Sequence, residues 1–349
     1  MKKQSFIDAV LAWFSRLGAQ YSRQKNFSDK TLWFLAAFVF VGAFAPFLAS
    51  SQPLFIYDKA GYERKHGIEL KRSPLLYSLF NSDAKAEKIE YRKLVEKGEI
   101  GAVFTLVPYS PYEAELENYL KPPEFFGKRF KHYLGTDETG RDVAARLIRG
   151  TRNSLLVSLV AVGLALMIGV MIGAAAGYFG GWVDIVISRF IEVVICFPKL
   201  ILIIAVMALK KPSLLNLMIV IGVTSWTGIA RLIRGEVMRI RNYDYVQSAR
   251  AMGASPWRII FIHILPATVG PLSVTAAFDV AEAVLTESAL SFLGIGVPIP
   301  EPSWGDVLKT AQDFPDIAWW MTLFPGLLIF QTVITFNNLG DKLRERFTR

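Results

Sequence analysis

Six long apolar stretches divide the chain, and polar segments of very different lengths separate them. The apolar stretches are 32–50, 155–177, 185–209, 214–230, 267–293 and 317–336. A hydrocarbon core of about 30 Å needs about 20 apolar residues in a helix to cross it. Lipid offers no partners to backbone amides, so stretches of this length are expected to be helices. The pattern predicts an all-α integral membrane protein with six transmembrane helices.

The longest polar segment, 51–152, follows the first predicted helix. Charged residues with a few apolar positions predict a helix over 84–98, and an apolar run predicts a short strand over 102–109 that prolines end. We expect a small extracytoplasmic subdomain here. A disordered tether is the alternative.

Charge orients the predicted helices. The chain has 349 residues, of which 52% are hydrophobic, and a net charge of +9. Basic residues are spread over the N-terminus, the loops and the tail, which is typical of cytoplasmic flanks rather than of a nucleic-acid surface. The basic segment 1–31 and the tail 341–349 are expected in the cytoplasm, and 32–50 is expected to be an uncleaved first helix. A membrane domain is then expected over 153–340, with a cytoplasmic loop at 231–266.

Few residues in the sequence suggest catalysis or metal binding. The single cysteine, Cys196, lies in an apolar run and is expected to be a small buried side chain. The histidines His66, His132 and His263 are predicted on different sides of the membrane, so no metal or catalytic cluster is expected. The pattern G-x-x-x-x-G-K-[ST] does not occur, so no P-loop is expected to bind ATP and no cofactor is implied.

Charged residues inside the predicted membrane helices need an explanation, because each costs roughly 2.5–3.5 kcal/mol at the bilayer centre. Asp279 and Glu282 lie three residues apart in the fifth stretch. Either they line a substrate path and attract a cationic group, or they pair with Lys199 or with a charge on a partner subunit. Arg189 and Glu192 have the same spacing and are expected to form an ion pair.

Two further features concern packing. Small residues recur every four positions in the second stretch and predict close helix packing, within the chain or against a neighbouring subunit; they are Ala161, Ala165, Gly169, Gly173 and Gly177. Glu287, near the outer end of the fifth stretch, is expected to make a structural hydrogen bond.

The polar segment before the fifth stretch has the signals of two short helices joined by a turn. Good helix formers over 243–252 end at Gly253, the usual residue just past a helix end. Ser255 fits the N-cap of the next helix and Pro256 its first position. Pro266 is expected to start or kink the next membrane helix.

Small residues in this segment (Ser248, Ala249 and Ala251) could let another protein approach closely. It is either a docking element or an amphipathic helix that rests on lipid.

The same segment resembles the EAA loop of ABC importer permeases. That pattern is E-A-A, three residues, Gly, nine residues and I-x-L-P, and the spacing here matches throughout. Gln247 and Ser248 stand where the pattern has Glu and Ala, and His263 stands at the Ile position, so a salt bridge of the usual Glu is not expected. Further segments resemble the oligopeptide and dipeptide branch of the family; they are 134–155, 177–184, 188–198 and 286–308.

The resemblance implies a MetI-like fold, with a five-helix core and an additional N-terminal helix. It also implies a permease subunit that forms the path for peptides or peptide-like cargo. The implied partners are a homologous permease subunit, two cytoplasmic ATPase subunits, an extracytoplasmic substrate-binding protein and membrane lipid, with no nucleic acid. The insertion at 51–131 is similar to that of microcin C-type permeases.

In that family the ATPase binds the EAA loop. The corresponding residues here are Gln247, Ser248, Ala249, Gly253, Ser255 and Pro256. The alternative function is a membrane channel or scaffold without an ATPase partner.

Overall fold

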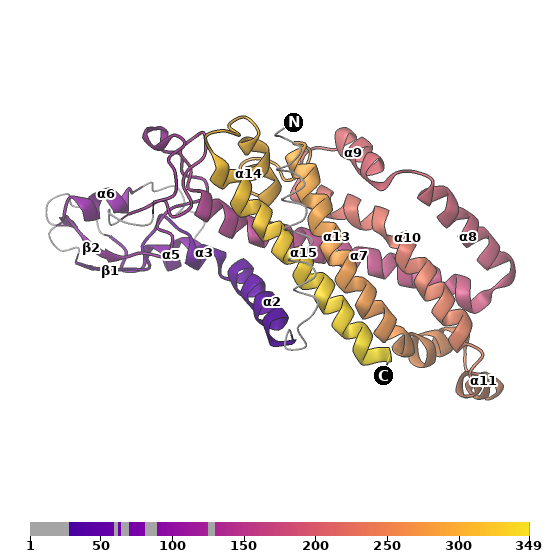
Figure 1. Ribbon diagram of the computed structural model, residues 1–349. Coiled ribbons are helices and arrows are strands. Elements are labelled where there is room, and N and C mark those ends of the chain that lie inside the picture. The colour runs from indigo at the N-terminus through magenta and orange to yellow at the C-terminus, as the bar shows by residue number, and fades with distance from the viewer. Residues whose placement is uncertain (1–27, 59–61, 64–69, 81–88, 125–129, 349) are drawn as a thin grey trace.

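The computed structural model describes residues 28–58, 62–63, 70–80, 89–124 and 130–348. Four long helices form the body of the molecule: α7 (Val143–Phe179), α10 (Leu214–Ile240), α13 (Val269–Phe292) and α15 (Trp319–Thr348). A small region of strands and short helices lies at one end of this bundle, and α11 (Asp244–Ala251) lies at the other (Figure 1).

Part of the predicted set of membrane helices is found among the described residues. Among the described residues four helices are long and apolar enough to cross a bilayer, and a bent pair of helices would make a fifth. The first predicted helix is shorter than a span, because α2 (Ser28–Ala43) ends before a separate turn, α3 (Ala45–Leu48), with a proline in its first turn. The predicted N-terminal segment 1–31 lies almost wholly outside the described residues.

The third predicted helix is broken. α8 (Gly181–Ile195) and α9 (Lys199–Leu209) meet at an angle of 80°. Pro198 accounts for the break, because a proline lacks the amide that would continue the helix and disfavours helical conformation in the residue before it. Cys196 lies in this break and is exposed, so the prediction of a buried cysteine was wrong.

Small residues bring α7 and α10 together, as one of the two sequence interpretations expected. A Cβ added at Gly173 would lie 2.4 Å from the backbone oxygen of Ala230, and Gly169 and Gly177 face α10 at similarly close range. Only residues without a side chain allow two helical backbones to approach this closely. The small-residue ridge is therefore used for packing within the chain.

The described part of 51–142, which we call the outer region after its predicted position, has its own apolar cluster. β1 (Phe55–Asp58) pairs antiparallel with β2 (Gly101–Val103), and α6 (Tyr91–Glu96) packs beside them. The short elements α5 (Pro74–Phe80) and η2 (Leu116–Asn118) complete the described part. The strand is shorter than predicted, and part of the predicted helix, 84–88, lies outside the described residues.

A buried arginine joins this outer region to the bundle. Arg146 on α7 donates a 2.6 Å hydrogen bond to Asp137 and pairs with Asp306 on α14 (Trp304–Ala311). Burial raises the pKa of Asp137, but the charges of Arg146 and Arg141 outweigh that effect and hold it below the ordinary value. One guanidinium thus joins α7 to the segment just before it and to α14, which is 160 residues away in the sequence.

Two local predictions about charged side chains are confirmed. The buried carboxylate of Glu287 accepts hydrogen bonds from Ser154 at 2.7 Å and from Ser291 at 2.8 Å. Arg189 and Glu192 form an ion pair of 2.6 Å on the exposed side of α8.

Candidate functional site

A helix–turn–helix element projects from the end of the bundle opposite the outer region (Figure 1). α11 ends at Ala251, and Gly253 follows with a φ of 82°. A Cβ on Gly253 would meet nothing within 4 Å, so its backbone conformation alone favours glycine here. The predicted helix end is confirmed.

The second helix of the element begins as its sequence signals predict. Ser255 is the N-cap of α12 (Pro256–Arg258), its hydroxyl accepts a 3.4 Å hydrogen bond from the Arg258 amide, and Pro256 occupies the first turn. We call residues 244–258 the coupling element.

The coupling element runs into the fifth membrane helix without a loop. α12 continues as a π-helical segment, η3 (Ile259–Ile264), and a 3₁₀ turn, η4 (Leu265–Thr268), before α13 begins. The Leu265 amide donates to the Ile260 carbonyl, a wider turn than that of an α-helix. Pro266 therefore changes the helix winding without ending the helix.

The buried face of α11 is apolar. Val246 packs on the isoleucines of η3, and Ala249, on the same helix, is only 4% exposed. Ala249 is therefore packed within the chain in this structure, and its contact with an ATPase stays a prediction. Ser248 is exposed, and the most exposed apolar side chain of the element is Met252, at 82%.

Gln247 has a role that a glutamate could not fill. Its side-chain amide donates a 3.1 Å hydrogen bond to the carbonyl of Arg241, at the end of α10. Arg241 in turn donates to the carbonyls of Gly177 and Tyr178, at 2.9 and 3.2 Å, near the end of α7. A carboxylate accepts hydrogen bonds only, so the departure from the EAA pattern fits this local geometry.

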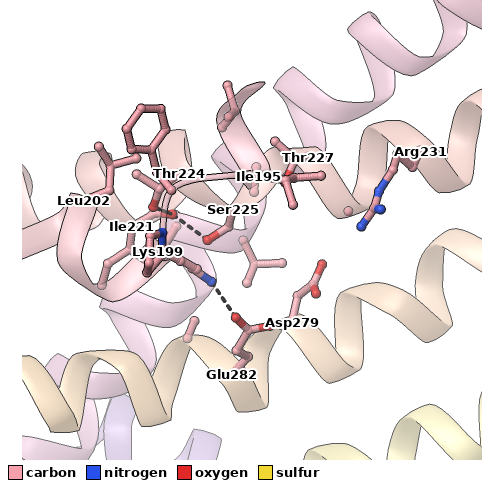
Figure 2. Close-up of a pocket in the computed structure, with 18 residues that line it drawn as sticks. Ile195, Lys199, Leu202, Ile221, Thr224, Ser225, Thr227, Arg231, Asp279 and Glu282 are labelled. Carbon is pink, nitrogen blue, oxygen red and sulfur yellow. Dashed lines mark hydrogen bonds and ion pairs between the residues drawn. The ribbon is translucent and has the colours of Figure 1, made fainter. Parts of the chain in front are cut away.

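A cavity of about 350 Å³ lies inside the bundle. Its walls come from α7, from the break between α8 and α9, from α10 and from α13 (Figure 2). The polar side chains that line it are Lys199, Thr224, Ser225, Thr227, Arg231, Asp279 and Glu282.

The cavity combines the two interpretations of the acidic pair. Lys199 forms a 2.6 Å ion pair with Glu282, which was the structural alternative, yet both side chains border the hollow (Figure 2). One carboxylate oxygen of Asp279 is buried and has no hydrogen-bond partner among the described residues. Such groups are rare in a membrane interior and mark functional positions.

Sequence reasoning missed Arg231 as a cavity residue. The apolar run ends at residue 230, so Arg231 was assigned to the cytoplasmic loop 231–266. In the structure α10 continues to Ile240, so residues 231–240 are helical. Arg231 follows Thr227 by four residues and so lies on the same helix face. That spacing was the sequence signal that could have placed Arg231 at the cavity.

Metal binding has no support in the described part of the chain. No group of three or more His, Cys, Asp or Glu side chains lies close together there. His132 is buried next to Asp142 at 2.8 Å, His263 lies on η3 near the opposite end, and His66 lies outside the described residues.

The C-terminal half of the chain matches a known protein family. Residues 169–349 match the family of binding-protein-dependent transport system inner membrane components. The chain belongs to this family. It is therefore a multi-pass membrane component of an ABC-type transport system, and ATP hydrolysis falls to separate subunits.

Relatives of this inner membrane component include transport permeases from several bacteria. A glutathione transport system permease of Pectobacterium atrosepticum is 39% identical over 236 residues, or 67% of this chain and 78% of that protein. A di/tripeptide transport system permease of Pseudomonas aeruginosa is 39% identical over 241 residues, or 69% and 80%. Among solved structures, an inward-facing methionine ABC transporter aligns with a TM-score of 0.49 and 18% identity, over 58% of this chain and 96% of that chain.

Proposed function

We propose that this chain is the permease subunit of an ATP-driven importer of peptides, and that residues 244–258 are its contact with the ATPase. The observation that carries the proposal is the continuity of the coupling element with α13, which lines the polar cavity. The peptide cargo is supported by the relatives, whose names describe dipeptide, di/tripeptide and glutathione transport.

The mechanism follows from this continuity. ATP binding favours one state of the assembled transporter over the other, and the coupling element is displaced when the ATPases close. α12 transmits that displacement through η3 and η4 to α13, which carries Asp279 and Glu282. The hydrogen bonds of Gln247 and Arg241 transmit the same displacement to α7. The cavity walls then move together.

The assembly we propose has six membrane-crossing segments in this chain, with α2 as the first and both termini in the cytoplasm. A homologous permease completes the pore, two ATPases bind on the cytoplasmic side, and a binding protein delivers cargo to the outer region. Asp279 and Glu282 lie on the substrate path. The exposed ion pair of Arg189 and Glu192 supports a second permease, because charges on a membrane helix favour a protein or aqueous surrounding over lipid.

Substitution at the tip of the coupling element tests the proposal. Met252→Glu places a charge where an apolar side chain would dock, and we expect it to reduce co-purification of the ATPases by at least about tenfold. Met252→Leu keeps an apolar tip and is the matched control. Both variants should reach the membrane in normal amounts, because the side chain of Met252 has few contacts within the chain.

The channel or scaffold alternative makes the opposite prediction. If no ATPase co-purifies with the wild-type protein, or if Met252→Glu retains a full complement, the proposed coupling is wrong.

A further inference from the structure

Four charged side chains line the cavity, and only two of them satisfy each other. Lys199 and Glu282 form the ion pair described above. The side chain of Arg231, on α10, makes no hydrogen bond or ion pair with any described residue, and Asp279, on α13, keeps one buried oxygen without a hydrogen-bond partner. The cavity thus holds one cationic side chain with no described partner and one carboxylate with an unsatisfied oxygen.

Arg231 and Asp279 border the same cavity from different helices. Figure 2 shows Arg231 extending from α10 and Asp279 rising from α13, with Thr227 one turn before Arg231. Asp279 and Glu282 are the eleventh and fourteenth residues of the 24-residue helix α13, which belongs to a candidate membrane span. Unpaired charge is costly inside a membrane span, whereas a ligand of opposite charge at each group would reduce that cost.

The hydroxyl groups nearby are arranged to accept rather than donate. Thr224 and Ser225 donate their hydroxyl hydrogens to carbonyls of their own helix, at 2.6–3.0 Å. Their oxygens can therefore accept a hydrogen bond from a ligand, such as one from an ammonium or amide N–H. The cavity volume of about 350 Å³ falls within the roughly 300–1,000 Å³ of small-molecule sites.

We infer that this cavity binds a zwitterion, a short peptide whose free amino terminus contacts Asp279 and whose free carboxyl terminus contacts Arg231. The inference rests on the proposed function, since it takes the cavity to lie on the peptide path. It goes further by assigning one residue to each end of the cargo. An acidic pair alone would favour any cation; the opposed arginine selects cargo that also carries a carboxylate.

Three forms of one dipeptide test the assignment in the complete transporter. The probes are alanyl-phenylalanine, its N-acetyl derivative and its C-terminal amide, and the measurement is uptake by cells with the wild-type chain, Asp279→Asn or Arg231→Gln. Each variant's rate is divided by the wild-type rate for the same probe, which cancels any selectivity of the binding protein. Binding of the same probes to the purified complex, measured without the binding protein, provides a second readout.

Each variant should affect only the probes that carry the charged terminus its residue is proposed to contact. Asp279→Asn should reduce transport and binding of the free dipeptide and its amide about tenfold and leave the N-acetyl form within about twofold. Arg231→Gln should reduce those of the free and N-acetyl forms and leave the amide within about twofold. Thr286→Val, one turn beyond Glu282 and outside the cavity lining, should leave all three unchanged.

The outcomes separate this inference from the proposed function. If either variant lowers all three probes equally while its membrane abundance is normal, the zwitterion assignment is overturned and the importer proposal stands. If the wild-type transporter neither carries nor binds any of the probes or other peptides, the importer proposal fails and the assignment fails with it.

Discussion

Charged residues at the outer end of this molecule have ion-pair partners, whereas some in its middle do not among the described residues. At the outer end Arg146 is 3% exposed and is held by Asp137 and Asp306. Halfway through the bundle Asp279 and Arg231 have no such partners among the described residues. Fully paired buried charges stabilise one arrangement, and incompletely paired ones are free to engage a ligand.

The ion pairs of Asp137 predict a pH-dependent stability. Its pKa in the folded protein is below the ordinary value, so its stabilising contribution is complete above about pH 4 and is lost as the pH falls further. Asp137→Asn should lower the free energy of unfolding by about 1–3 kcal/mol at pH 7. Thermal unfolding in detergent at pH 7 and pH 3.5 should show the difference from wild type shrinking at the lower pH. A penalty that is the same at both values would contradict the assignment.

Residues whose roles are set by their neighbours in sequence were predictable. Gly253, Ser255 and Pro256 have the predicted conformations because helix ends depend on a few consecutive residues. The pairing of Lys199 with Glu282 depends on a contact across 83 positions, and the pattern could offer it only as one alternative. Arg231 was missed because hydropathy marks where apolar residues stop, not where the helix stops.

Helices in this protein are longer and more interrupted than hydropathy suggests. The second apolar stretch predicts 155–177, but α7 begins at Val143, where Asp142 caps it by accepting a 2.7 Å hydrogen bond from the Ala145 amide. The third stretch contains Pro198 and bends by 80°. Hydropathy reports contact with lipid or core, whereas helix ends are set by caps and prolines, and the two signals need not coincide.

The contact between α7 and α10 predicts opposite effects for one substitution at two sites. Gly173→Ala would place its Cβ 2.4 Å from the Ala230 oxygen and force the helices apart, at a cost of about 1–3 kcal/mol. Gly163→Ala, on the same helix, meets nothing within 4 Å and should be neutral or stabilising by up to about 1 kcal/mol. Thermal unfolding of the purified variants measures both. Equal effects would show that the two helices do not pack through Gly173.

At the scale of the whole molecule, the outer region and the coupling element lie at opposite ends of one helical bundle. The outer region lies beside the start of α7, and the coupling element lies near its end (Figure 1). The charge pattern of the sequence predicts the same separation across a membrane. The tertiary contacts that join the four long helices, in contrast, could not be derived from the one-dimensional pattern.

Cysteine labelling tests the two-sided arrangement. In a Cys196→Ser background, Leu116→Cys and Met252→Cys introduce thiols at positions that are 77% and 82% exposed. A membrane-impermeant maleimide should label the first in intact spheroplasts and the second only after permeabilisation, in a strain without the ATPases. Labelling of both positions in intact spheroplasts would place the coupling element on the wrong side for a cytoplasmic motor.

The unbroken length of α7 has a mechanical consequence. Its 37 residues contain no proline, and its two ends adjoin the outer region and the hydrogen bonds from Arg241. A rigid rod about 55 Å long swings its far tip by roughly 10 Å for each 10° of tilt. A small tilt of α7 at the end that Arg241 contacts would therefore displace the region at its other end by several ångströms.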